Sequence, residues 1–268
     1  MTMTASMIRK LNGLLRAESL GKVIHYQDEM DSTNTTLLEL GEKGASEGTV
    51  VIADRQTGGR GRLERKWISP AGTNLYISIL FRPEIAASDA PLFTLIASIS
   101  LNKVIEKLGV AETKIKWPND IQISGKKAAG ILTEMRPKRE MVDFIVVGIG
   151  VNINMTREDM NEEMGKVAHI ATSIKEHLGK DINRSKFAAD LLLELENWYQ
   201  IFSNKGKAII LSEWTNMWGD LNKRVRVKIE EKDSYEGAAI GIDEKGYLMI
   251  KTDYGEINTV ISGDVIVL

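Results

Sequence analysis

The stretch Gln56-Thr57-Gly58-Gly59-Arg60-Gly61-Arg62-Leu63-Glu64-Arg65-Lys66-Trp67 crowds glycines and guanidinium groups into twelve residues. Residues 54–66 carry five cations and two acids, a local charge of +3, in a chain whose net charge is −2. Glycine lacks a Cβ, so backbone N–H groups can approach a ligand closely. Guanidinium groups offer fixed forks of donors that match phosphate and carboxylate oxygens. This stretch, the glycine–arginine loop (residues 56–67), therefore predicts a clamp for a small polyanion.

A solvated or RNA-binding loop is the alternative for this stretch, because arginine–glycine runs in disordered tails bind nucleic acid. The run is short, however, and it lies between two expected strands. It matches neither the P-loop, since no Gly-Lys-Ser/Thr follows, nor the dinucleotide-binding fingerprint. The net charge of −2 and a pI near 6.0 also oppose the broad basic face that nucleic-acid binding needs.

Composition limits the remaining classes of protein. A chain of 268 residues with 43% hydrophobic content predicts one large domain and a small one. Cysteine is absent, which excludes disulfides and thiolate metal sites, and the three histidines lack metal-ligand spacing. No apolar run approaches the roughly 20 residues of a membrane span, and the N-terminus lacks a signal-peptide pattern. We therefore expect a cytoplasmic protein without membrane association.

Hydrophobic periodicity and turn residues predict an α+β fold. Helices are expected over residues 31–43, 88–109, 187–202 and 208–218, and strands over 23–26, 49–53, 75–81, 113–117, 129–135 and 144–152. The polar stretch 156–166 has no clean period, so we expect a mobile loop there. Five short strands after about Leu221, separated by turn signals, predict a small β-barrel.

Four further motifs place polar or small residues at the ends of expected elements. They are Asp31-Ser-Thr-Asn34, Lys114-Ile-Lys-Trp-Pro-Asn-Asp120, Gly125-Lys-Lys-Ala-Ala-Gly-Ile-Leu132 and Gly148-Ile-Gly-Val-Asn-Ile-Asn154. Each also has a purely structural interpretation: a helix cap, a turn, a surface lysine beside tight backbone, and a close-packed strand, in that order. Singly they leave the function open, whereas their order in one chain is far more specific.

That order resembles the biotin–protein ligases. The matching residues are Ser32-Thr-Asn34, Gln56, Gly59-Arg-Gly-Arg62, Arg65-Lys-Trp67, Lys116-Trp-Pro-Asn-Asp120, Lys127-Ala-Ala-Gly130 and Gly148 to Asn152, spaced as in that family. The resemblance implies a mixed-sheet catalytic domain flanked by helices, similar to class II synthetases, over residues 23–220. A small SH3-like β-barrel over residues 221–268 would follow it. Residues 1–22 form a short segment that cannot hold the winged helix of the family's bifunctional members, so we expect the ligase-only type and no DNA binding.

The resemblance also implies a reaction. It is ATP-dependent biotinylation of one lysine on a biotin carboxyl carrier protein, such as that of acetyl-CoA carboxylase, through biotinyl-5′-AMP. Magnesium would accompany the ATP phosphates without a dedicated set of protein ligands. Members of this type pair through sheet edges, which makes a homodimer one expectation.

Site residues follow from the matching motifs. The resemblance implies catalytic roles for Lys127, Arg60, Arg62 and Asp120, with Lys127 between the biotin carboxyl and the α-phosphate and Asp120 receiving or orienting the acceptor ammonium. It implies biotin binding by Ser32, Thr33, Asn34, Gln56, Gly59, Arg60, Gly61, Arg62, Lys127 and Gly130. It implies ATP binding by Arg62, Arg65, Trp67, Asn119, Asp120, Lys127 and Asn152.

Three other functions remain to be weighed. A lipoate or octanoate ligase of related fold is the nearest, although the arginine–glycine loop and the Ser-Thr-Asn cluster favour biotin over a long apolar acid. A nucleic-acid-binding regulatory protein is opposed by the net charge and by the absence of a helix-turn-helix pattern. An inactive paralogue is disfavoured because every motif residue needed for the chemistry is present.

Overall fold

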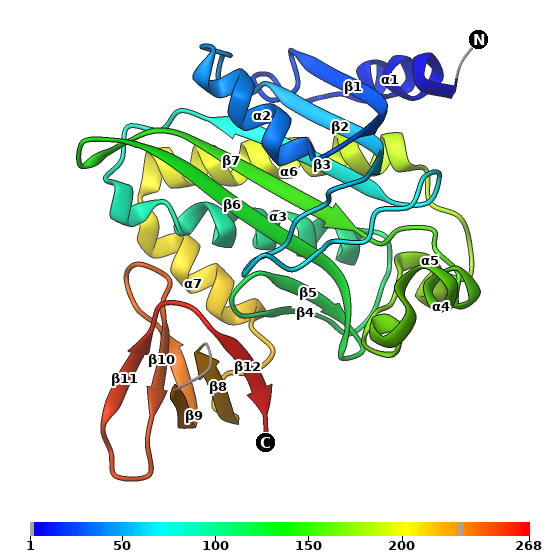
Figure 1. Ribbon diagram of the computed structural model, residues 1–268. Helices are drawn as coiled ribbons and strands as arrows, with labels where there is room; N and C mark the ends of the chain where they lie inside the picture. Colours follow the sequence, from blue (N-terminus) through cyan, green and yellow to red (C-terminus); the bar gives the residue numbers. More distant parts are fainter. Residues whose placement is uncertain (1–2, 230–232) are drawn as a thin grey trace.

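The larger part of the chain is built on a seven-stranded mixed sheet, seen in the computed structural model of Figure 1, which describes residues 3–229 and 233–268. The strand order is β1-β2-β3-β7-β6-β5-β4, in which β1 and β2 run parallel and the other neighbours antiparallel. The strands are β1 Ile24–Met30, β2 Val50–Gln56, β3 Leu75–Phe81, β4 Thr113–Lys116, β5 Asp120–Ile123, β6 Lys126–Lys138 and β7 Met141–Val151.

Helices cover both faces of this sheet. Helix α2 (Thr33–Glu42) packs against β2, β3 and β7 on one face, while α3 (Leu92–Lys107) packs against β4 to β7 on the other. Helices α6 (Arg184–Lys205) and α7 (Lys207–Met217) pack on α3, and α1 (Met3–Leu14) lies against α6 (Figure 1). Because neighbouring residues of a strand face opposite sides, Val50 and Ile52 join the larger hydrophobic core and Val51 and Ala53 the smaller one. None of the helices within residues 3–229 and 233–268 has the length and hydropathy that crossing a membrane requires.

A separate antiparallel sheet follows α7, which confirms the predicted run of five C-terminal strands. Its strands are β8 Arg224–Ile229, β9 Asp233–Ile242, β10 Leu248–Lys251, β11 Ile257–Val260 and β12 Asp264–Val267, in the order β11-β10-β9-β8-β12. It lies beside β4 and β5 at one end of the main sheet (Figure 1). Trp117 Nε1 donates to Gly246 O at 3.1 Å and so joins the two parts.

The mobile loop predicted for residues 156–166 is wrong. Residues Arg157–Met164 form helix α4, the 3₁₀ helix η2 (Gly165–Ile170) follows at once, and α5 spans Ile174–Leu178. The helix begins in a capping box in which Thr156 Oγ1 accepts from Asp159 N–H while the Asp159 carboxylate accepts from Thr156 N–H. Its side chains are too polar to show a helical period, so the cap was the only signal of this helix.

Strand β5 was also not predicted. Pro118 was expected to end a strand, with Asn119 and Asp120 either projecting from the strand end or forming a plain turn. The chain instead reverses at this proline, and residues 120–123 pair back onto β4. Asp120 is therefore the first residue of a strand and lies opposite Gly130 of β6.

Candidate active site

A cavity of about 560 Å³ opens where the glycine–arginine loop meets the ends of β5, β6 and β7. Its lining comes from distant parts of the chain, among them residues 32–34 at the start of α2, 60–63 and 65–67 of the loop, 116–120, 130–132, 148–150, four residues between 164 and 171, and 264–266. The predicted site residues in this lining are Ser32, Thr33, Asn34, Gln56, Arg60, Gly61, Arg62, Arg65, Trp67, Asn119, Asp120, Lys127, Gly130 and Asn152. The fold thus gathers motifs that are spread over more than a hundred residues.

Gly59 is the predicted residue that lies outside this lining. Its carbonyl accepts from the N–H of Trp67 at 2.8 Å, and a Cβ at this position would come within 2.4 Å of Trp67 O. The glycine is therefore required by the close approach of two backbone segments inside the loop, rather than by a ligand.

Lys127 and Asp120 form an ion pair in the cavity. Nζ of Lys127, on β6, lies 2.6 Å from Oδ1 of Asp120, on the neighbouring strand β5. The same ammonium lies over the indole of Trp67, 5.4 Å from the ring centroid. A carboxylate and an aromatic face both attract an ammonium group, so these two contacts hold the end of the Lys127 side chain in the cavity.

Two glycines of β7 make room for the side chains of the site. A Cβ on Gly150 would lie 2.4 Å from Trp67 Nε1, and one on Gly148 would lie 2.0 Å from Asn34 Oδ1. The motif Gly148-Ile-Gly150 was interpreted as either close packing or a site. The structure shows that close packing of site residues requires both glycines.

Neutral polar side chains line another part of the cavity. Thr33 donates to Gln56 Oε1 through its N–H (2.8 Å) and its hydroxyl (3.1 Å), and Gln56 Nε2 donates to Ser69 Oγ at 3.0 Å. Ser32 Oγ accepts from Thr35 N–H, so the predicted helix cap is present as well. This cluster is fixed by its own hydrogen bonds and presents preformed donors and acceptors to a ligand.

Glu134 lies outside the cavity lining but contacts two predicted site residues, and it was not itself predicted. Its Oε2 accepts from Arg60 Nη2 at 2.7 Å and from Asn34 Nδ2 at 2.9 Å. It therefore links the predicted cation to the predicted amide. The signal was strand alternation, because Gly130, Leu132 and Glu134 follow one another on the same face of β6.

The C-terminal sheet reaches into the same site. Arg62 donates to Ser262 Oγ at 2.6 Å and to Asn119 Oδ1 at 3.4 Å, while Arg65 forms a two-pronged ion pair with Asp264. The hydrogen bond from Arg65 is the main reason why the pKa of Asp264 lies below its usual value. Burial lowers the pKa of the Arg62 guanidinium, although Asp264 and Asp120 oppose this shift. Neither Ser262 nor Asp264 was predicted, because nothing local marks a strand end 200 residues away as a partner of the loop.

Two predicted nucleotide-binding amides also hold the backbone. Asn119 Nδ2 donates to Ile131 O at 2.7 Å, and Asn152 Nδ2 donates to Thr172 O at 3.1 Å. Asn152 lines the cavity but is 1% exposed, so its side chain mainly holds the backbone beside the cavity.

The chain resembles several characterised proteins. It is 37% identical to the bifunctional ligase/repressor BirA of Bacillus spizizenii over 94% of this chain and 76% of that protein. It is 32% identical to the biotin–[acetyl-CoA-carboxylase] ligase of Mycobacterium tuberculosis over 94% of this chain and 92% of that protein. The structure matches the biotin protein ligase from Aquifex aeolicus in complex with biotin and ATP, with a TM-score of 0.76 and 30% identity over 92% of this chain and 99% of that one.

The sequence profiles that match this chain define its class, the biotin and lipoate protein ligases. The sequence profile of the biotin/lipoate A/B protein ligase family matches residues 26–152, and that of the biotin protein ligase C terminal domain matches residues 220–268. The chain belongs to the biotin protein ligase family and is an enzyme.

Proposed function

We propose that the chain catalyses ATP-dependent biotinylation of a lysine on a biotin carboxyl carrier protein, through biotinyl-5′-AMP. The observation that carries this proposal is that one cavity holds the Lys127–Asp120 pair, three loop arginines and the fixed polar cluster around Thr33 and Gln56. In this proposal residues 23–220 form the catalytic domain, and residues 221–268 form a second domain that adds Ser262 and Asp264 to the site.

In the first step, a carboxylate oxygen of biotin attacks the α-phosphorus of ATP. A C–O–P bond forms, the bond between the α- and β-phosphates breaks, and pyrophosphate leaves with its electron pair. Two anions must meet, so catalysis depends on fixed cations and donors where charge develops. Lys127 would lie between the two reacting groups, while Arg60 and Arg62 would hold the phosphates.

In the second step, the acceptor amine attacks the carbonyl carbon of the mixed anhydride. An amide bond forms, the C–O bond between the acyl carbon and the phosphate oxygen breaks, AMP leaves with that electron pair, and the proton lost by the nitrogen passes to solvent. Asp120 lines the cavity beside Lys127, and its carboxylate would orient the incoming ammonium. The neutral cluster suits the uncharged ureido ring of biotin, because a site built to hydrogen-bond such a ring leaves its own polar groups unpaired with other acids.

Magnesium fits the site only as a companion of the nucleotide. Within the described residues there is no group of three or more His, Asp or Glu side chains that could hold a metal ion. Asp120 and Asp264, both in the lining, are already paired with Lys127 and Arg65. The ion would screen phosphate charge, and the protein would hold it through ATP rather than through its own carboxylates.

The acceptor is proposed from the relatives and the chemistry together. One similar protein is the biotin–[acetyl-CoA-carboxylase] ligase of Mycobacterium tuberculosis, which supports a carboxylase carrier as the substrate. A carrier presents its lysine on a folded domain, so the second step needs an open cavity mouth as well as the small-molecule pocket.

Pyrophosphate release with ATP and magnesium, without any acceptor, tests the proposal directly. Biotin, lipoate and octanoate are compared at equal concentration. We expect a burst stoichiometric with protein for biotin alone, which would establish both adenylation and retention of the product. A burst with lipoate or octanoate instead would overturn the substrate, and no burst with any acid would overturn the reaction.

A further inference from the structure

One wall of the cavity is formed by residues 164–171, the wall segment, which consists of η2 and its flanking residues. Its side chains Met164, Val167, Ile170 and Ala171 line the cavity. Val167 and Ile170 are 48% and 53% exposed, so part of their apolar surface is open to the cavity that they line. A six-residue 3₁₀ helix is also longer than such helices usually are, because their hydrogen bonds are poorly aligned. The wall segment therefore needs support from outside itself.

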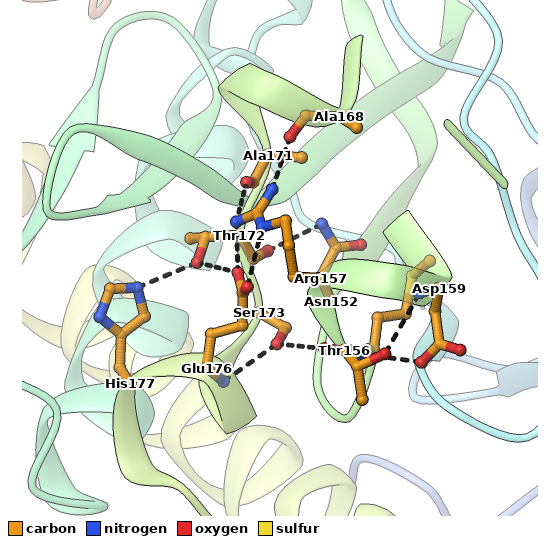
Figure 2. Close-up of polar contacts among 11 residues, drawn as sticks. Asn152, Thr156, Arg157, Asp159, Ala168, Ala171, Thr172, Ser173, Glu176 and His177 are labelled. Atoms are coloured by element: carbon orange, nitrogen blue, oxygen red, sulfur yellow. Dashed lines mark hydrogen bonds and ion pairs between the residues drawn. The ribbon is translucent and has the colours of Figure 1, made fainter. Parts of the chain in front are cut away.

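Arg157 of α4 supplies that support. Its Nη1 donates to Ala168 O at 2.8 Å and its Nη2 to Ala171 O at 3.1 Å. Figure 2 shows the guanidinium between these carbonyls and the carboxylate of Glu176 on α5, to which Nε donates at 2.9 Å and Nη2 at 2.5 Å. One side chain thus ties together α4, the end of the wall segment and α5.

Glu176 is itself held in place. Thr172 Oγ1 donates to Glu176 Oε2 at 2.9 Å, which uses the only proton of that hydroxyl. The contact of 3.0 Å between Thr172 Oγ1 and His177 Nε2 must then run from the ring N–H to the hydroxyl (Figure 2). Burial lowers the pKa of His177, which is consistent with a neutral ring. Arg157 therefore binds a carboxylate whose orientation is already fixed.

The hydrogen-bond network around Arg157 extends to the backbone of Lys127. Thr172 N–H donates to Lys127 O at 2.9 Å, and Lys127 and Ala171 form a parallel bridge. On the other side, Asn152 Nδ2 donates to Thr172 O at 3.1 Å. Backbone hydrogen bonds thus join the end of the wall segment to the strand that carries the lysine.

We propose that Arg157, together with Glu176, is a positioning residue that fixes the wall segment and thereby sets how long an acyl-adenylate stays in the cavity. This inference rests on the proposed function. Two of the acceptors of Arg157 are main-chain carbonyls whose positions do not depend on side-chain rotamers. A single planar fork spans both carbonyls and the carboxylate, which a lysine ammonium cannot do. The position of the wall segment therefore depends on the planar geometry of the guanidinium as well as on its charge.

Arg157→Lys tests this geometry, with Arg136→Lys as the matched control. Arg136 on β6 pairs with Glu42 through a single exposed contact of 2.9 Å and lies outside the cavity lining. We expect Arg157→Lys to keep the pyrophosphate burst with biotin but to raise the slow release after the burst by about tenfold, equivalent to about 1.4 kcal/mol. That later release reports escape of the adenylate, so a merely structural role would not move it while the burst stays intact. Arg136→Lys should match the parent protein.

Hydrogen exchange in the ligand-free protein is the second readout. Arg157→Lys should speed exchange of the amides of residues 164–172 and leave those of β3 unchanged. If exchange and later release both match the parent, or if exchange rises without faster release, the proposal is overturned. Should Arg157→Lys fail to fold, Glu176→Gln, which keeps the carbonyl contacts but weakens the ion pair, decides by the same two measurements. If the parent protein shows no burst with any acid, the proposed function is wrong. The exchange data would still show whether Arg157 stabilises the wall segment.

Discussion

Lys127 Nζ lies 2.6 Å from Asp120 Oδ1, and this ion pair bridges two neighbouring strands of the main sheet. Asp120 opens β5 directly after the turn at Pro118, while Lys127 lies near the start of β6. The Asp120 carboxylate and the Lys127 ammonium thus neutralise each other in this structure. In the proposed reaction, an incoming anion would compete with Asp120 for the Lys127 ammonium.

Lys127→Ala should abolish adenylate formation while leaving biotin binding detectable. Loss of one group that stabilises developing charge costs about 10²- to 10³-fold in rate. The variant also leaves Asp120 unpaired where two anions must meet. The measurements are pyrophosphate release for the rate and calorimetry for biotin binding. Lys126→Ala is the control, because Lys126 is the exposed neighbour on the same strand. Release at the parental rate would show that Lys127 has been misassigned.

Gly150→Ala should displace the Trp67 ring and so distort the cavity. The added Cβ would lie 2.4 Å from Nε1 of the Trp67 indole, so the ring must move away from its place beneath Lys127. Overpacking of this kind typically costs about 1–3 kcal/mol in the free energy of unfolding. Urea unfolding measures the loss, and biotin affinity should fall with it. Gly13→Ala is the matched control, since nothing lies within 4 Å of its new Cβ and the residue is in helix α1. Equal stability of the two variants would contradict the packing argument.

The fold could be predicted where side chains show a clear period. The helix expected over 187–202 is α6, and the C-terminal strands were found because turn residues such as Asp243 and Gly246 separate them. Helix α4 was missed because its stability comes from a capping box and from the network around Arg157, not from an apolar stripe. Strand β5 was missed because the sequence Pro118-Asn-Asp120 is equally typical of a turn with no strand after it.

The site could be predicted only as far as its motifs are local. The lysine, the loop arginines and the Ser-Thr-Asn cluster reached the same cavity, although their roles stay predictions. Ser262 and Asp264 could not be inferred, because their proximity to Arg62 and Arg65 depends on how the second sheet packs. The same holds for Arg157, whose partners are main-chain carbonyls that no side-chain pattern reveals.

The glycine–arginine loop should become harder to cleave when the site is filled. Its cations repel one another, and in the structure they are matched by acceptors from other elements, with Arg60 bound to Glu134 and Arg65 to Asp264. Phosphate would neutralise them more fully, so biotin with ATP should protect residues 54–66 from limited proteolysis. Asp264→Ala should make the free loop easier to cleave by less than about fivefold, because exposed ion pairs are worth only about 0.2–1 kcal/mol. Equal cleavage with and without ligands would contradict phosphate binding by the glycine–arginine loop.

Acid should weaken the attachment of the N-terminal segment through Glu196 of α6. Burial raises the pKa of this carboxyl, but hydrogen bonds from Ser19 Oγ and from the N–H groups of Glu18, Ser19 and Leu20 outweigh burial and lower it below the ordinary 4.5. A depressed pKa means that the unfolded chain binds the proton first as the pH falls. The stabilisation is therefore complete above pH 4.5 and is lost as the pH falls through the lower pKa of the folded state. Glu196→Gln should cost about 1–3 kcal/mol at pH 7 by leaving donors poorly matched, and the difference from the parent in urea unfolding should shrink below pH 4.5. A difference that stays constant from pH 7 to pH 4 would show that the carboxylate charge does not hold this segment.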